Sequence, residues 1–136
     1  MKFPYKKLPS GRVRPIIPLQ VSYKGGKSLG YFALVDSGAD ICIFHTEIAD
    51  IIGIKNIESG RKSLVGGITQ GEVQAYYTHP VTITVGGWNY DIEVAFMPTL
   101  SKLGYGLLGQ SGFFSIFSIK FDFLKEEIEL KEYKKK

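Results

Sequence analysis

The stretch that decides the fold reads Leu34-Val35-Asp36-Ser37-Gly38-Ala39-Asp40. An acid stands directly at the end of an apolar strand, and a small hydroxyl residue and a glycine follow it. A carboxylate in apolar surroundings costs free energy unless something uses it. Asp-Ser-Gly alone also fits an ordinary turn that closes a strand. A second element, of two apolar residues and a glycine at 107–109, lies far downstream. Its presence favours a functional interpretation of Asp-Ser-Gly over an ordinary turn.

Outside this stretch the pattern is mostly β. Strands are expected over 13–23 and 29–35 as a hairpin, over 64–65, 72–78, 81–85 and 90–96 as a meander with glycine turns, and near 119–123 and 128–130. Pro15 and Pro18 restrict the first strand to a sheet edge or an unpaired run. Two short helices are expected, at 47–52 with Thr46 as N-cap and Gly53 at its end, and at 113–119.

Length and composition predict one domain spanning 1–136, with an extended or frayed arm at 1–11 and a basic tail at 131–136. The chain has 136 residues, of which 44% are hydrophobic and 22% charged. No apolar run approaches eighteen residues, so a membrane partner is not expected. The first residues lack the apolar core of a signal peptide, which favours a cytoplasmic, intracellular location.

Charge and metal-binding residues narrow the function classes. Much of the excess that makes the net charge +4 lies at the two ends of the chain, where solvated tails are the simpler interpretation than a nucleic-acid surface. Cys42 is the single cysteine, and no Cys/His set has the spacing of zinc ligands, so no metal or cofactor is expected. Cys42 is expected to be a small buried hydrophobe, and His45 and His79 to be surface or capping residues.

Four motifs follow one another in the order found in the retroviral-type aspartic proteases, the retropepsins, which the sequence resembles from about residue 14 onwards. They are Arg14-Pro15, the acid loop 34–40, the glycine-rich Leu64-Val65-Gly66-Gly67-Ile68, and Leu107-Leu108-Gly109. The resemblance implies a mostly β, closed barrel-like subunit with one or two short helices, active as a C2 homodimer. A short helix is expected after Gly109.

The chemistry of amide hydrolysis agrees with a dimer. One carboxylate must take a proton from water while a carboxylic acid gives one to the carbonyl oxygen. Two carboxyls about 3 Å apart share one proton and titrate as a pair, as is general for aspartic proteases. Because the chain has one Asp-Ser-Gly, the second carboxyl must come from another copy.

The resemblance also implies a role for each matching residue. Asp36 would be the catalytic acid or base, and the loop around it would be supported by Ser37, Gly38 and Ala39. Asp40 would bind the substrate backbone, and Gly66, Gly67 and Ile68 would form a flap that closes over the peptide. Apolar walls for the substrate side chains would come from Leu34, Val65, Tyr105 and Leu107.

The chain departs from the family pattern at Gln110, where these enzymes often carry arginine. A neutral amide cannot replace a buried guanidinium in an ion-pair network. The stretch between Arg14 and Asp36 is also longer than in the small viral enzymes.

Three functions therefore remain open. The first is an aspartic endopeptidase that cuts peptide or protein substrates. The second is a catalytically weak or inactive dimeric peptide-binding module of the same fold. The third, from another class, is a small basic β-barrel that binds nucleic acid, which the end-weighted charge disfavours.

Overall fold

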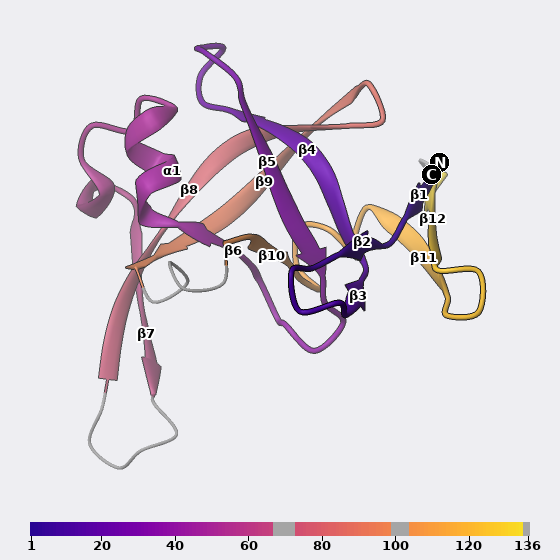
Figure 1. The fold of residues 1–136 in the computed structure, drawn as a ribbon. Helices are drawn as coiled ribbons and strands as arrows, with labels where there is room; N and C mark the ends of the chain where they lie inside the picture. Colours follow the sequence, from indigo (N-terminus) through magenta and orange to yellow (C-terminus); the bar gives the residue numbers. More distant parts are fainter. Residues whose placement is uncertain (67–72, 99–103, 135–136) are drawn as a thin grey trace.

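The computed structural model describes residues 1–66, 73–98 and 104–134. Its helical elements are α1 (Thr46–Ile51) and the 3₁₀ turn η1 (Ile57–Ser59). Its strands are β1 (Lys2–Pro4), β2 (Lys6–Lys7), β3 (Val13–Arg14), β4 (Ile16–Ser22), β5 (Leu29–Val35), β6 (Cys42–His45), β7 (Arg61–Gly66), β8 (Val73–Val85), β9 (Trp88–Met97), β10 (Gly106–Leu108), β11 (Phe117–Asp122) and β12 (Glu127–Glu132). The prediction of a mostly β fold with little helix is confirmed (Figure 1).

A closed barrel forms most of the molecule. Its strands follow the order β4-β5-β10-β6-β9-β8-β7, and β4 also pairs with β8, so the sheet closes on itself (Figure 1). Most neighbours are antiparallel, whereas β10 runs parallel to β5 and β6 runs parallel to β9. The short strand β10 is inserted between β5 and β6, and this insertion brings the segment 106–109 beside the end of β5.

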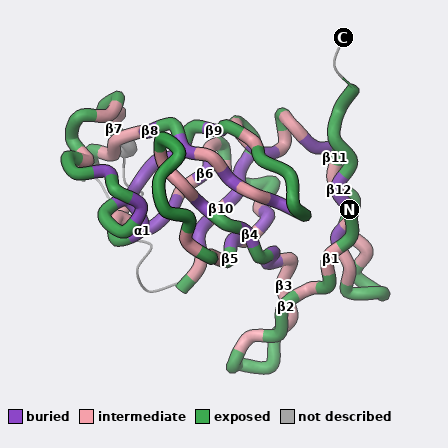
Figure 2. Tube along the Cα trace, turned by 90° about the horizontal axis from the view of Figure 1, so that it is seen from above, coloured by how far each residue is buried: buried purple, intermediate pink, exposed green. Residues whose placement is uncertain are grey.

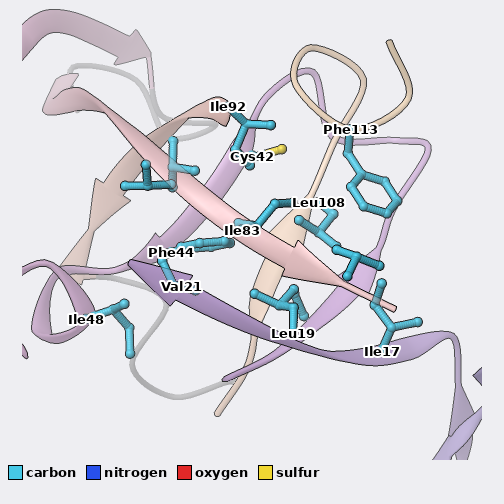
Figure 3. Packing of buried hydrophobic residues seen from close by; sticks show 14 of the residues in the cluster. Ile17, Leu19, Val21, Cys42, Phe44, Ile48, Ile83, Ile92, Leu108 and Phe113 are labelled. Atoms are coloured by element: carbon cyan, nitrogen blue, oxygen red, sulfur yellow. The ribbon is translucent and has the colours of Figure 1, made fainter. Parts of the chain in front are cut away.

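The barrel interior is filled by the apolar face of each strand. Alternate residues of β4, namely Ile17, Leu19 and Val21, are buried, while Pro18 and Gln20 between them are exposed. These side chains meet others from the facing strands, among them Phe44, Ile83 and Leu108 (Figure 3). Figure 2 shows the same separation along the chain, with buried segments inside the barrel and exposed ones on its rim. Each such side chain stabilises the fold by about 1.5–3 kcal/mol relative to exposure.

The predicted hairpin and the glycine turn are confirmed. β4 and β5 pair from Ile16 opposite Leu34 to Val21 opposite Leu29. β4 is an edge only over its first half, because β8 pairs with it from Gln20 onwards, and Pro18 lies in the open half. The turn between β8 and β9 uses positive φ angles of 58° and 87° at Gly86 and Gly87, a conformation that glycine adopts without strain.

The ends of the chain form a separate three-stranded sheet in the order β1-β12-β11. Phe3 pairs with Ile128, and the Met1 amino group donates to the Leu130 carbonyl at 3.0 Å (Figure 1). β2 pairs with β3 in antiparallel orientation. Residues 1–11, for which an extended or frayed arm was expected, contain β1 and β2, and β12 continues through residue 132.

Three local predictions were wrong. Residues 113–119 do not form a helix: turns occupy 112–116 and β11 begins at Phe117. The separate strands expected at 72–78 and 81–85 are one long strand, β8. Thr46 is the first residue of α1 and not its cap, since His45 holds the N-cap position without a side-chain hydrogen bond. Within the described residues, no helix has the length and apolar character that crossing a membrane requires.

Candidate active site

The acid loop begins where β5 ends and is held by backbone hydrogen bonds. The N–H of Asp36 donates to the Leu108 carbonyl at 3.0 Å, so the residue is tied to β10 as it leaves the strand. The carboxylate Oδ1 of Asp36 accepts the N–H of Gly38 at 2.9 Å, and the Asp36 carbonyl accepts the N–H of Ala39 at 3.2 Å. This tight turn fixes the direction of a half-exposed carboxylate.

The second motif, 107–109, lies directly beside the acid loop. Leu107 pairs with Leu34 and Leu108 with Val35 in parallel register. Gly109 has no room for a side chain, because an added Cβ would lie 2.6 Å from the Ala39 carbonyl oxygen and closer still to that of Ile41. The two elements that the sequence places some seventy residues apart therefore pack backbone against backbone, for which glycine is required.

The residues after Gly109 hold the acid loop in place through hydrogen bonds. The N–H of Gln110 donates to the Ala39 carbonyl at 2.8 Å, and the N–H of Ser111 donates to the Asp40 carbonyl at 2.9 Å. The side-chain Nε2 of Gln110 donates to the Ser37 carbonyl at 2.7 Å. The sequence indicates Gln110 only as a departure from the family's arginine, because no sequence pattern identifies the Ser37 carbonyl as its hydrogen-bond partner.

The loop residues that were predicted to support the site are brought together. Ser37, Gly38 and Asp40 are exposed, and Ala39 is half-buried. An added Cβ at Gly38 would lie 3.2 Å from Oδ1 of Asp36, so glycine suits the close approach of backbone and carboxylate. The loop therefore presents its carboxylates and backbone to solvent on one side of the barrel.

The Arg14-Pro15 motif also reaches the loop. The Pro15 carbonyl accepts the N–H of Val35, the residue before Asp36, at 2.9 Å. The Arg14 guanidinium donates to the neighbouring Val13 carbonyl at 3.4 Å. The motif thus meets the start of the acid loop through the proline carbonyl, while the described hydrogen bond of the arginine is local.

The structure describes only some of the residues that were predicted to contact the substrate. Leu34 and Leu107 are register partners on adjacent strands and are both half-buried, and Tyr105 precedes β10, also half-buried. Val65 and Gly66 belong to β7, where they pair with the start of β8. Gly67 and Ile68, the predicted tip of the flap, lie outside the described residues.

His79 is buried, contrary to the prediction of a surface or capping residue, and His45 is also buried, although it holds the N-cap position of α1 without a side-chain cap hydrogen bond. His45 is 7% exposed, and its Nδ1 lies 2.5 Å from the hydroxyl of Tyr31, forming a hydrogen bond. His79 is 3% exposed, and its Nε2 donates to the Ile57 carbonyl at 2.6 Å. Burial raises the pKa of Tyr31 well above its usual range. Both imidazoles thus serve the packing of the fold beneath its surface.

Cys42 is buried as predicted, and its environment disfavours the thiolate. Its Sγ accepts the N–H of Gly109 at 3.4 Å and donates to the Ser111 carbonyl at 3.6 Å. Burial raises the pKa of the Cys42 thiol to about 11, although the hydrogen bond from Gly109 opposes this effect. A thiol with this pKa and no exposure is not a nucleophile.

Comparison with known proteins places this geometry in a family. A family model described as aspartyl protease matches residues 19–111. A retropepsin-like aspartic protease from Rickettsia conorii is similar with a TM-score of 0.64 and 17% identity, over 96% of this chain and 89% of that one. EIAV protease in complex with the inhibitor HBY-793 has a TM-score of 0.43 and 25% identity, over 71% of this chain and 82% of that one. No curated protein matches the chain.

Proposed function

The chain belongs to the retropepsin-like aspartic proteases, and we propose that it is an endopeptidase whose active site forms when the Asp36 carboxyls of two identical chains meet. One observation supports this above the others. The Asp36 carboxylate is half-exposed at the end of β5, directly after the buried Val35, and the Gly38 N–H donates to its Oδ1 at 2.9 Å. A rigid and accessible carboxylate is what general acid-base catalysis requires.

The proposed reaction uses both carboxyls in turn. The ionised one takes a proton from water, whose oxygen then bonds to the scissile carbonyl carbon, while the protonated one gives its proton to the carbonyl oxygen. The tetrahedral intermediate collapses when the carboxyl that took the water proton gives it to the amide nitrogen, one hydroxyl of the intermediate returns its proton to the other carboxylate, and the C–N bond breaks to release an amine and a carboxylic acid. Since each chain supplies one Asp-Ser-Gly, the pair requires a second copy of the chain.

The remaining loop residues would position this pair. Ser37, Gly38 and Ala39 support the turn, and Asp40 would bind the peptide backbone of the substrate. The half-buried side chains of Leu34, Tyr105 and Leu107, together with Val65, would contact apolar side chains beside the cut bond. Gly66, Gly67 and Ile68 would form the lid over the peptide.

The test is hydrolysis of a peptide library by the protein and by Asp36→Asn between pH 4 and 6.5. The substitution removes the group that exchanges protons but keeps its size, and hydrolysis is expected to fall to background. Asp50→Asn, at an exposed position of α1, is the matched control and is expected to retain full activity. Cleavage by Asp36→Asn at the normal rate would overturn the proposal.

The pH dependence gives an independent check. Activity is expected to be bell-shaped with its maximum on the acid side of neutrality, because one carboxyl of the pair must be protonated and the other ionised. A rate that climbs steadily to pH 9 would contradict the shared proton. A protein that binds peptides at every pH without cutting them would instead be a binding module of the same fold.

A further inference from the structure

A row of side chains leads across the sheet from the acid loop to a charged residue of β7. The strands β5, β10, β6, β9, β8 and β7 are consecutive neighbours in the sheet. Register partners on neighbouring strands project from the same face of a sheet. The partners that continue this face from Leu34 are, in order, Leu107, Ile43, Ala95, Thr78 and Arg61. The face that begins with two residues proposed to contact the substrate therefore ends at a guanidinium.

A small hollow lies at the far end of this row. Besides Ala95, Thr78 and Arg61, it is lined by Ile41, Tyr76, Glu93 and Ser111. The acid loop borders the hollow, because Ile41 follows Asp40 and the N–H of Ser111 donates to the Asp40 carbonyl at 2.9 Å. The hollow has a volume of about 60 Å³. Since a water molecule takes about 30 Å³ in the liquid, the hollow has room for the end of a short side chain and not for an aromatic ring.

The hollow carries an ion pair between β7 and β9. Nη2 of Arg61 donates to Oε2 of Glu93 at 3.0 Å, and the two side chains are 71% and 60% exposed. A guanidinium has five N–H donors, and a carboxylate can accept at both of its oxygens, so one hydrogen bond uses only part of what the pair offers. A ligand in the hollow therefore finds a donor and an acceptor side by side.

This arrangement favours a neutral polar ligand over a charged one. A side-chain amide can donate to the Glu93 carboxylate and accept from the Arg61 guanidinium while the ion pair stays intact. A lysine side chain would be repelled by Arg61 and an aspartate by Glu93, and either would have to compete with the existing pair. Ile41 and Ala95 add apolar contacts for the methylene groups of the ligand.

We propose that this hollow holds a short neutral polar side chain of the peptide substrate, and that Arg61 and Glu93 determine this specificity. The inference rests on the proposed function, because the peptide must lie along the face of Leu34 and Leu107 in order to reach the hollow. β9 lies three strand spacings from β5, which is about 14 Å along the sheet. An extended peptide covers that length in about four residues. The side chain is therefore the fourth from the cut bond, and each chain of the dimer supplies one hollow.

The experiment compares three peptides that differ in one side chain. They share a library sequence that the wild-type protein cuts, or binds if it does not cut, and carry Asn, Lys or Asp at the fourth residue before the cut. The wild-type kcat/KM is expected to be about fivefold higher for the Asn peptide than for either charged peptide, which is the size of effect that an exposed ion pair can have. Equal values for the three peptides would overturn the inference.

Two single variants test the ion pair in opposite directions. Arg61→Gln leaves the Glu93 carboxylate without its cation, so the kcat/KM ratio of the Lys peptide to the Asp peptide is expected to rise about fivefold. Glu93→Gln leaves the Arg61 guanidinium alone, so the same ratio is expected to fall about fivefold. The double variant is expected to show no preference between the two charged peptides. Both positions are exposed, so all three variants are expected to fold.

Lys62→Gln is the matched control. Lys62 is also exposed on β7, next to Arg61, but it pairs with Tyr77 and projects from the opposite face of the strand. The substitution removes the same charge without changing the hollow, so the ratio of the Lys peptide to the Asp peptide is expected to keep its wild-type value. A rise equal to that of Arg61→Gln would mean that the net charge of the β7–β8 hairpin selects the peptide, and would overturn the inference.

The outcomes separate this inference from the proposed function. If the protein cuts peptides but Arg61→Gln and Glu93→Gln leave the ratio unchanged, the hollow does not contact the substrate and the proposed function stands. If the protein binds peptides without cutting them, the proposed function fails. The same ratios are then measured as dissociation constants by fluorescence anisotropy of labelled peptides, where the same opposite shifts support the hollow and unchanged values overturn it. A protein that neither cuts nor binds any library peptide overturns both.

Discussion

The side-chain amide of Gln110 donates to the backbone carbonyl of Ser37 at 2.7 Å, so the residue after the second motif holds the residue after the candidate catalytic acid. Retropepsins often carry arginine at the position of Gln110. In this chain the neutral side-chain amide supplies a hydrogen-bond donor where the guanidinium would be. Together with the N–H of Gln110 on the Ala39 carbonyl, it makes a two-point clamp on the loop.

Gln110→Ala is expected to loosen this clamp. Loss of one neutral hydrogen bond at an exposed position is expected to lower the free energy of unfolding by about 0.5–1.5 kcal/mol. The turnover number for peptide hydrolysis is expected to fall several-fold, because the loop carries Asp36. Gln110→Arg, which keeps N–H donors, is expected to recover most of the activity, and equal rates for all three proteins would show that the contact has no role.

Gly109→Ala is expected to be far more disruptive than an ordinary glycine substitution. The new Cβ would overlap the Ala39 and Ile41 carbonyl oxygens, and overpacking of this kind typically costs about 1–3 kcal/mol or more. Gly30→Ala is the matched control, because it lies in β5 with no atom within 4 Å of the added Cβ. Urea unfolding of the two variants is the measurement, and equal midpoints would contradict the packing argument.

Much of the barrel could be predicted from the sequence because its determinants are local. Alternating apolar residues in β4 and in the second half of β8 identify half-buried strands, and Gly86-Gly87 identifies the turn between β8 and β9. The periodicity of apolar residues could not predict the site. That 107–109 lies beside the acid loop was expected only from the family resemblance, because the parallel pairing of β10 with β5 has no signal in the local sequence.

The wrong predictions share a physical cause, which is that tertiary contacts decided them. The segment 113–119 has apolar residues at helical spacing, yet Gly112 at φ 105° and the pairing of Phe117 with Glu132 give turns and a strand. His79 is buried because the Ile57 carbonyl accepts its Nε2–H, a partner that the sequence does not identify.

Tyr31→Phe is expected to destabilise the barrel although the ring is conserved. The substitution deletes the hydrogen bond to Nδ1 of His45 but keeps the edge-to-face contact with Phe44 at a centroid distance of 5.1 Å. Loss of a buried hydrogen bond is expected to lower the free energy of unfolding by about 1–2 kcal/mol. Tyr133→Phe, at a position 56% exposed, is expected to change it by less than about 0.5 kcal/mol, and a matching loss there would contradict the assignment.

Cys42 is expected to make stability fall at alkaline pH. Burial raises the pKa of its thiol from 9.0 to about 11 in the folded protein, so the folded state keeps a proton that the unfolded chain releases between these values. The stabilisation is fully present below pH 9 and is lost as the pH rises toward 11. Because one pKa unit corresponds to about 1.4 kcal/mol, the loss is on the order of 2–3 kcal/mol.

The check is urea unfolding of the wild-type protein and of Cys42→Ala from pH 8 to 11. The variant loses packing at every pH, so its absolute stability is lower, but its free energy of unfolding is expected to fall less steeply above pH 9. Burial also raises the pKa of Tyr31, and that contribution cancels because it is the same in both proteins. Parallel curves would mean that the folded thiol ionises as readily as the unfolded one, which is incompatible with the buried contacts to Gly109 and Ser111.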